Sequence, residues 1–140
     1  MTTVLTKFAL PSHLSERCLF HSGPEVENPT FVLHWMRGAI RLDECPTFDV
    51  ARLISDSLNL PLIVYQGIDE RYPHASYRHH RFLMEGAADI ANHAEELGVE
   101  YLLHISRKGH RNPVLRELSL QSAIVVTDLM DLNPWKKWTK

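Results

Sequence analysis

The chain has 140 residues, of which 44% are hydrophobic and 23% are charged, and its formal net charge is −2 at pH 7. This length and composition predict a single soluble domain that can bury a sizeable core. The slightly negative charge excludes a chain that attracts nucleic acid or anionic membranes through its overall field, so any site for a polyanion must be a local patch.

The N-terminus lacks the long apolar core of a signal peptide, and no apolar run approaches the roughly 18 residues that a membrane span needs. The two cysteines, Cys18 and Cys45, indicate neither a disulfide framework nor a zinc cluster, and we interpret them as inert thiols. We therefore expect a cytoplasmic protein with no membrane partner.

The distribution of prolines, glycines and apolar runs divides the chain into three segments. Residues 1–29 are predicted to be an irregular lead-in with one short helix, from Ser12 to Arg17. Residues 30–130 are predicted to form an α/β domain. Residues 131–140 form a tail, whose Trp135 and Trp138 are more typical of packing than of stacking on bases.

Four apolar runs alternate with three helical patterns in the α/β segment. Strands are predicted at 30–36, 60–66, 99–105 and 123–127, and helices at 46–58, 76–97 and 112–120. Proline at the first helical position marks the start of the first helix after a weak cap at Cys45, and an Asn112-Pro113 pair marks the start of the third. The second is expected to begin at the N-cap Ser76 and to stop at Gly98.

The longest helix, 76–97, has an apolar stripe that should pack on the sheet. Its members recur every three or four residues and are Leu83, Ala87, Ile90, Ala94 and Leu97. Extended backwards, the spacing reaches His80. Arg78, Arg81 and Glu85 fall away from the stripe, towards solvent or a partner.

Strands that alternate with helices through short loops predict right-handed βαβ units on a parallel sheet. We expect a Rossmann-like, doubly wound sheet with strand order 3-2-1-4 in a three-layer α/β/α arrangement. In such folds a ligand crevice lies at the carboxyl ends of the strands where the winding direction changes, here between strands 1 and 4. That rule places Arg37, Gly38, Ala39 and Asp128 at the mouth of the crevice.

Several common kinds of site find no support in the sequence. The loop after the first strand has a single glycine, Gly38, and so contains neither a dinucleotide-binding G-x-G-x-x-G nor a P-loop. His74, His79 and His80 do not share the spacing of ligands on one helix face, and we expect no metal site. His34 lies within a strand and is predicted to be a hydrogen-bonded core histidine rather than a catalytic one.

Arg37 and Arg41 both flank the predicted crevice. Two cations at this position could hold an anionic ligand or an adjoining domain. The alternative is that both lie in a solvated loop, without a binding role.

The segment from Trp35 to Cys45, WMRGAIRLDEC, resembles the pattern W-F-R-x-D-L-R-x-x-D-N of the N-terminal α/β domain in the photolyase/cryptochrome family. The tryptophan and both arginines match, whereas Ala39 and Cys45 replace the first aspartate and the asparagine of the pattern. The stretches 71–76 and 78–82 are most similar to class II cyclobutane pyrimidine dimer photolyases, and 123–128 resembles the fourth strand of the family. The resemblance covers roughly residues 10–130.

The resemblance implies a domain that is not catalytic on its own. In this family the N-terminal domain can hold a light-harvesting pigment, a deazaflavin or a folate, which passes excitation energy to FAD. A following helical domain holds FAD, takes in the flipped pyrimidine dimer and repairs it. That domain and the fifth strand of the family sheet are missing from this sequence, so the chain alone is not expected to repair DNA.

The resemblance also suggests roles for individual residues. Arg37, Arg41 and Glu44 are predicted to line the pigment crevice or to face the flavin domain, and Arg78 and Arg81 to form a docking surface. We therefore expect a light-harvesting domain of a deoxyribodipyrimidine photolyase, as a fragment, a truncated gene product or half of a split protein. Its partner would be the FAD-binding helical domain, in cis or in trans, and damaged DNA would be reached only through that domain.

Two other hypotheses remain open at this point. One is a stand-alone nucleotide-binding module of Rossmann-like architecture, which would use the crevice without photochemistry. The other is a non-functional remnant that folds marginally.

Overall fold

A computed structural model describes residues 8–130 and contains one four-stranded sheet. The strands are β1 (Phe31–Met36), β2 (Leu62–Asp69), β3 (Glu100–Ser106) and β4 (Ser122–Thr127). All three pairings are parallel, and the order is β3-β2-β1-β4. The predicted parallel sheet and its strand order are confirmed.

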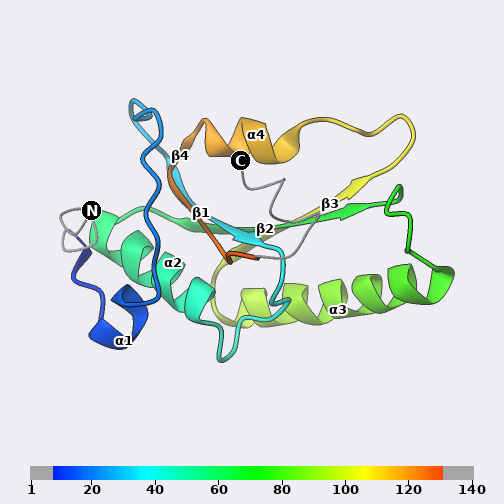
Figure 1. Ribbon diagram of the computed structural model, residues 1–140, viewed down its shortest axis with the longest axis horizontal. Coiled ribbons are helices and arrows are strands. Elements are labelled where there is room, and N and C mark those ends of the chain that lie inside the picture. The colour runs from blue at the N-terminus through cyan, green and yellow to red at the C-terminus, as the bar shows by residue number, and fades with distance from the viewer. Residues whose placement is uncertain (1–7, 131–140) are drawn as a thin grey trace.

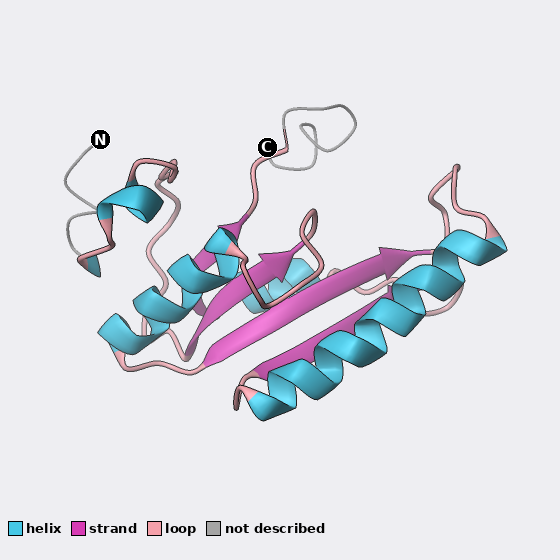
Figure 2. Cartoon of the chain, turned by 90° about the horizontal axis from the view of Figure 1, so that it is seen from below, coloured by secondary structure: helices cyan, strands magenta, loops and turns pink. Residues whose placement is uncertain are grey.

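Helices cover the two faces of this sheet unequally (Figures 1 and 2). The helices are α1 (Ser12–Ser15), α2 (Pro46–Leu58), α3 (Tyr77–Glu96) and α4 (Val114–Ser119). α2 and α3 lie side by side against one face, and the short α4 lies on the other. This arrangement is the predicted three-layer, Rossmann-like α/β/α fold.

The core is correspondingly divided into a large and a small cluster. The large cluster packs alternate residues of β1 and β2, such as Val32 and Val64, against the apolar faces of α2 and α3. The small cluster packs Phe31, Leu33 and Tyr65 under α4. Because β1 is buried from both sides, it is apolar at nearly every position, as parallel strands covered on both faces usually are.

The predicted ends of the long helix are confirmed. The hydroxyl of Ser76 accepts a hydrogen bond from the backbone N–H of His79 at 3.2 Å, which caps the first turn of α3. At the other end Gly98 takes the left-handed conformation (φ +66°), and Val99 N–H donates back to the carbonyl of Ala94 at 2.9 Å. This is the 6→1 bond of a Schellman motif, which favours glycine.

Other boundaries differ from the predictions. β2 begins two residues later than predicted and continues past Gly67 to Asp69, because β3 runs beside it and pairs with Gly67 in register. α4 begins at Val114 with Pro113 in the cap position, so the prediction of Asn112 as its N-cap is wrong. The α1 helix ends at Ser15, before the predicted Arg17.

α2 spans the predicted residues, and no side chain caps its start at Cys45, as expected. Its end has a stop signal that sequence reasoning missed. Asn59 adopts φ +51°, and Leu60 N–H donates to the carbonyl of Ser55 at 3.1 Å, so asparagine serves here as the left-handed residue after the helix.

Within residues 8–130, no helix combines the length and apolar character needed to cross a membrane. The predicted tail, 131–140, lies outside the described residues, and so do Trp135 and Trp138.

Candidate functional site

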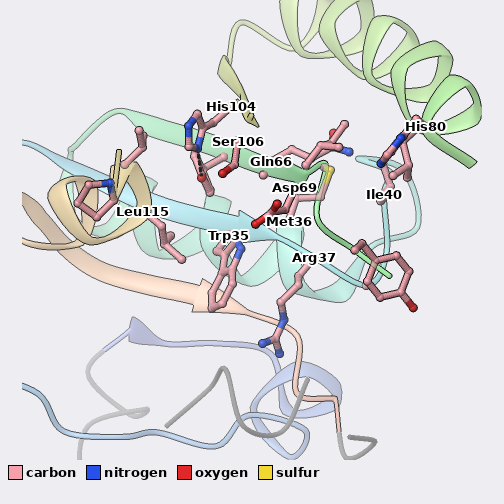
Figure 3. A pocket seen from close by; sticks show the side chains of 18 of the residues that line it. Trp35, Met36, Arg37, Ile40, Gln66, Asp69, His80, His104, Ser106 and Leu115 are labelled. Carbon is pink, nitrogen blue, oxygen red and sulfur yellow. Dashed lines mark hydrogen bonds between the residues drawn. The ribbon is translucent and has the colours of Figure 1, made fainter. Parts of the chain in front are cut away.

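A cavity of about 540 Å³ opens at the carboxyl ends of β1, β2 and β3 (Figure 3). On the α4 side it is open because this helix is too short to cover the sheet. α4 has six residues and β2 has eight, which correspond to lengths of about 9 Å and about 26 Å. The carboxyl halves of the strands therefore extend beyond the end of α4, and their side chains remain accessible.

The walls of the cavity are largely apolar and aromatic, with polar groups at a few positions. The apolar and aromatic residues are Trp35, Met36, Ile40, Tyr65, Ile68, Tyr72, Leu83, Val114, Leu115 and Met130. The polar residues are Arg37, Gln66, Asp69, His79, His80, His104, Ser106 and Asn112. An apolar hollow of several hundred Å³ with a few convergent polar groups is the usual form of a small-molecule site.

Beside this cavity, the junction between β1 and β4 is filled by protein groups. The Arg37 guanidinium lies 4.6 Å from the centroid of the Trp35 ring, and its Nη2 donates to the backbone carbonyl of Asp128 at 2.5 Å. A Cβ atom on Gly38 would lie 2.0 Å from the Asp128 carboxylate, so any larger residue there would require the Asp128 side chain to move. Arg37 thus ties the ends of the two strands together.

The predicted crevice is therefore corrected in its position. It lies over the ends of β1, β2 and β3, and not between β1 and β4 as the winding rule suggested. Arg37 and Gly38 line it, whereas Ala39 and Asp128 are absent from the lining that the structure describes. Asp128 instead borders a second hollow, of about 420 Å³, between α1, α2 and β4.

The other two residues predicted for this site, Arg41 and Glu44, are exposed in the loop between β1 and α2. Neither is among the described residues that line the cavity. Their predicted role at the crevice has no geometric support, and their role in facing a further domain stays a prediction.

Two hydrogen-bonded pairs on β2 and β3 were missed by sequence reasoning. Tyr65 Oη and His104 Nδ1 are 3.0 Å apart, and Tyr101 Oη donates to Gln66 Oε1 at 2.6 Å. Burial raises the pKa of Tyr65, and raises that of Tyr101 to about 12, so both hydroxyls keep their protons at neutral pH. The available signal was a polar residue, Gln66 or His104, within an otherwise apolar strand.

The loops that follow β2 and β3 form the rim of the cavity and are joined by Glu70. Its carboxylate accepts from the backbone N–H of Lys108 at 2.7 Å and from the Arg111 guanidinium at 2.6 Å. Next to it, a hydrogen bond from the Arg71 side chain lowers the pKa of Asp69 to about 2. Ion pairs and hydrogen bonds therefore hold the rim in place.

The start of α3 contributes one face to the cavity and another to solvent. His79 and His80 line the cavity, and His80 is half-buried on the apolar stripe as predicted. Arg78 and Arg81 are exposed, which confirms that they point away from the sheet. Phe82 beside them is 70% exposed, and Arg81 pairs with Glu85 at 2.7 Å.

His34 is a core residue, as predicted, but its predicted hydrogen bond is not found within residues 8–130. Its side chain is 1% exposed and packs on Phe48, with the ring centroids 5.9 Å apart. Nδ1 has no hydrogen-bond partner among the described residues. Burial lowers the pKa of His34 to about 4, and the charge of Asp128 opposes this shift.

No group of three or more His, Cys, Asp and Glu side chains in residues 8–130 is arranged to hold a metal ion. Both cysteines are free thiols there. Cys45 is buried, and burial raises the pKa of Cys18, which keeps its thiol protonated and poorly nucleophilic.

Comparison with known proteins gives one informative match. The chain is 30% identical over 109 residues to the deoxyribodipyrimidine photo-lyase of Methanothermobacter thermautotrophicus. This match supports a relationship to the photolyase family. The aligned region covers 78% of this chain and 24% of the photolyase, so the chain spans about a quarter of the length of its relative. No family model matches the chain.

Proposed function

We propose that this photolyase-related chain is a light-harvesting domain, which holds a pigment in the cavity at the carboxyl ends of β1, β2 and β3. The pigment would be a deazaflavin or a folate. In the whole protein it would pass excitation energy to FAD in a helical domain, which would repair cyclobutane pyrimidine dimers in DNA. The chain alone would not catalyse repair.

The observation that carries this proposal is the cavity itself. Its volume, about 540 Å³, lies within the range of roughly 300–1,000 Å³ that small-molecule sites occupy. Trp35 on β1 is half-buried in the lining and offers aromatic surface to a flat ring system, and Tyr65 lies beside it in register on β2. The similarity of the chain to a photolyase then favours a pigment over other flat ligands.

The same proposal assigns the exposed face of α3 to the helical domain. Arg78 and Arg81 would contact that domain in cis or in trans. The exposed ring of Phe82, the residue after Arg81, would supply an apolar anchor. The relation to class II photolyases and the roles of Arg41 and Glu44 at this boundary are parts of the proposal.

The test is the absorption spectrum of the chain purified from a pigment-producing host, followed by titration with added deazaflavin and folate. Binding should appear as a band above about 350 nm that stays with the protein in gel filtration, and pigment fluorescence should change on titration. Without such a band and without uptake of either compound, the proposal fails.

A matched pair of variants places the bound pigment. Ser106→Phe fills part of the cavity, because Ser106 is half-buried in its lining. Ser57→Phe makes the same change at an exposed position of α2. Pigment binding should be lost in the first variant and kept in the second, while both retain the circular dichroism of the parent. Calorimetry with ATP and adenosine runs in parallel, and nucleotide binding without pigment binding would favour the nucleotide-binding module instead.

A further inference from the structure

The Tyr65–His104 pair lies inside the candidate site, and its two ends differ in their surroundings. Tyr65 is buried, at 5% exposed, and its hydroxyl meets Nδ1 of His104 at 3.0 Å (dashed in Figure 3). His104 is half-buried and lines the cavity. Among residues 8–130, no protein group bonds to its other ring nitrogen, Nε2, which is left for a ligand or water.

The donor of the pair can be identified from the hydrogen-bond partners that are available to each atom. If His104 donated from Nδ1, the hydroxyl of the largely buried Tyr65 would have no protein acceptor in residues 8–130 for its own proton. An unsatisfied buried donor is costly, so the arrangement in which Tyr65 donates to Nδ1 is favoured. A neutral imidazole that accepts at Nδ1 carries its proton at Nε2.

Gly67 leaves the room that the Tyr65 hydroxyl needs. A Cβ atom at Gly67 would lie 3.0 Å from Tyr65 Oη and 3.4 Å from Cε1 of the same ring. Any larger residue would push the hydroxyl off its present position. Gly67 also pairs in register with His104, so the glycine stands directly beside the histidine that the hydroxyl orients.

We propose that His104 recognises the ring system of the bound ligand through a hydrogen bond donated by Nε2–H, and that Tyr65 is the positioning residue that fixes this tautomer. The inference rests on the proposed function of the cavity. It predicts a flat heterocycle with an acceptor atom, a ring carbonyl or an unprotonated ring nitrogen, at the edge that faces β3. Trp35 on β1 and His104 on β3 are two strand spacings apart, about 10 Å, a width that a fused ring system spans.

The tautomer is measured first, without ligand, by long-range ¹⁵N–¹H spectra of histidine-labelled protein at pH 8. Wild-type His104 should show an unprotonated Nδ1 and a protonated Nε2, and its signals are assigned by their loss in His104→Gln. Tyr65→Phe should give a mixture of tautomers. Tyr77→Phe makes the same change at an exposed site and should leave the spectrum as it is. A protonated Nδ1 in the wild type would overturn the proposal.

Ligand recognition is measured second, by fluorescence titration with a deazaflavin and with a folate. His104→Phe should weaken binding of the preferred probe about 10-fold, the value of one net hydrogen bond, and Tyr65→Phe should weaken it about two- to threefold. His104→Gln keeps an N–H donor and should recover part of the loss. Binding to His104→Phe with wild-type affinity would overturn this inference alone, whereas failure of both probes to bind the wild type would overturn the proposed function as well.

Discussion

Acidification should destabilise this fold through His34, and replacing this residue should remove the effect. His34 is almost completely buried between β1 and α2, and its Nδ1 has no partner among the described residues. Protonation would place a positive charge in the core, which is why burial lowers its pKa from 6.5 to about 4. The unfolded chain exposes the ring and binds the proton at the ordinary pKa.

The size of the effect follows from linkage. Between pH 6.5 and pH 4 the unfolded state carries more protons than the folded state, so the free energy of unfolding falls as the pH falls. The slope approaches about 1.36 kcal/mol per pH unit, and over the interval from 6.5 to about 4 it amounts to about 3 kcal/mol. The loss begins as the pH drops through 6.5, is complete below about 4, and is absent above 7.

Urea unfolding followed by tryptophan fluorescence, at four pH values from 7.5 to 4.5, measures this loss in the wild type and in His34→Leu. Leucine has a similar volume and no titrating group, and it removes an unpartnered nitrogen, so the variant should be at least as stable as the wild type at pH 7.5. Asp69 titrates near pH 2 and contributes little in this range. The stability difference between the two proteins should therefore report His34.

The variant should gain on the wild type by about 2 to 3 kcal/mol as the pH falls from 7.5 to 4.5. His21→Gln, at an exposed position, should keep the pH dependence of the wild type. A difference between wild type and His34→Leu that stays constant across the range would refute the reasoning, because it would mean that the buried ring is protonated without penalty.

The remaining predictions concern single contacts. Gly38→Ala should lower the free energy of unfolding by about 1–3 kcal/mol, because the new Cβ would meet a carboxylate at 2.0 Å. Gly86→Ala, in an open part of α3, should raise the free energy of unfolding by up to about 1 kcal/mol. Equal effects of the two substitutions would contradict this prediction. Ser76→Ala should cost about 1 kcal/mol through loss of the cap on α3, measured by urea unfolding. The double variant Arg78→Ala/Arg81→Ala should change the free energy of unfolding by less than about 0.5 kcal/mol, since both side chains are exposed. Loss of the folded state in this variant would rule out a purely surface role.

Much of the fold could be predicted because local signals agree with the final structure. The apolar run of β1, the stripe of α3, the Ser76 cap and the Gly98 stop each act within a few residues of chain. Such signals need no knowledge of neighbours. Prediction was poorer where the extent of an element depends on a neighbouring strand. β2 extends to Asp69 because β3 pairs with it there, and nothing in the sequence of β2 itself requires this.

The candidate site could not be predicted in detail, because it is formed by residues that are far apart in the sequence. Tyr65 and His104 are 39 residues apart in the chain and meet only through the register of β2 and β3. The position of the cavity depends on the length of α4, which was predicted too long at both ends. The winding rule located the edge of the sheet at which the cavity opens. It placed the crevice between β1 and β4, where Arg37 instead bonds across to the backbone of Asp128.

The unequal faces of the sheet separate stability from ligand binding. α2 and α3 together have 33 residues, and they bury the large core cluster against one face of β1 and β2. The face under α4 carries the small cluster, and the cavity opens at the carboxyl ends of the strands, where the starts of α3 and α4 both contribute to its lining. A side chain such as His104 can therefore change with little loss of core packing, whereas Val64, on the opposite face, cannot. Tyr65 belongs to the small core cluster, but Tyr65→Phe keeps its ring, so a loss of ligand binding in this variant or in a His104 variant need not be a loss of folding.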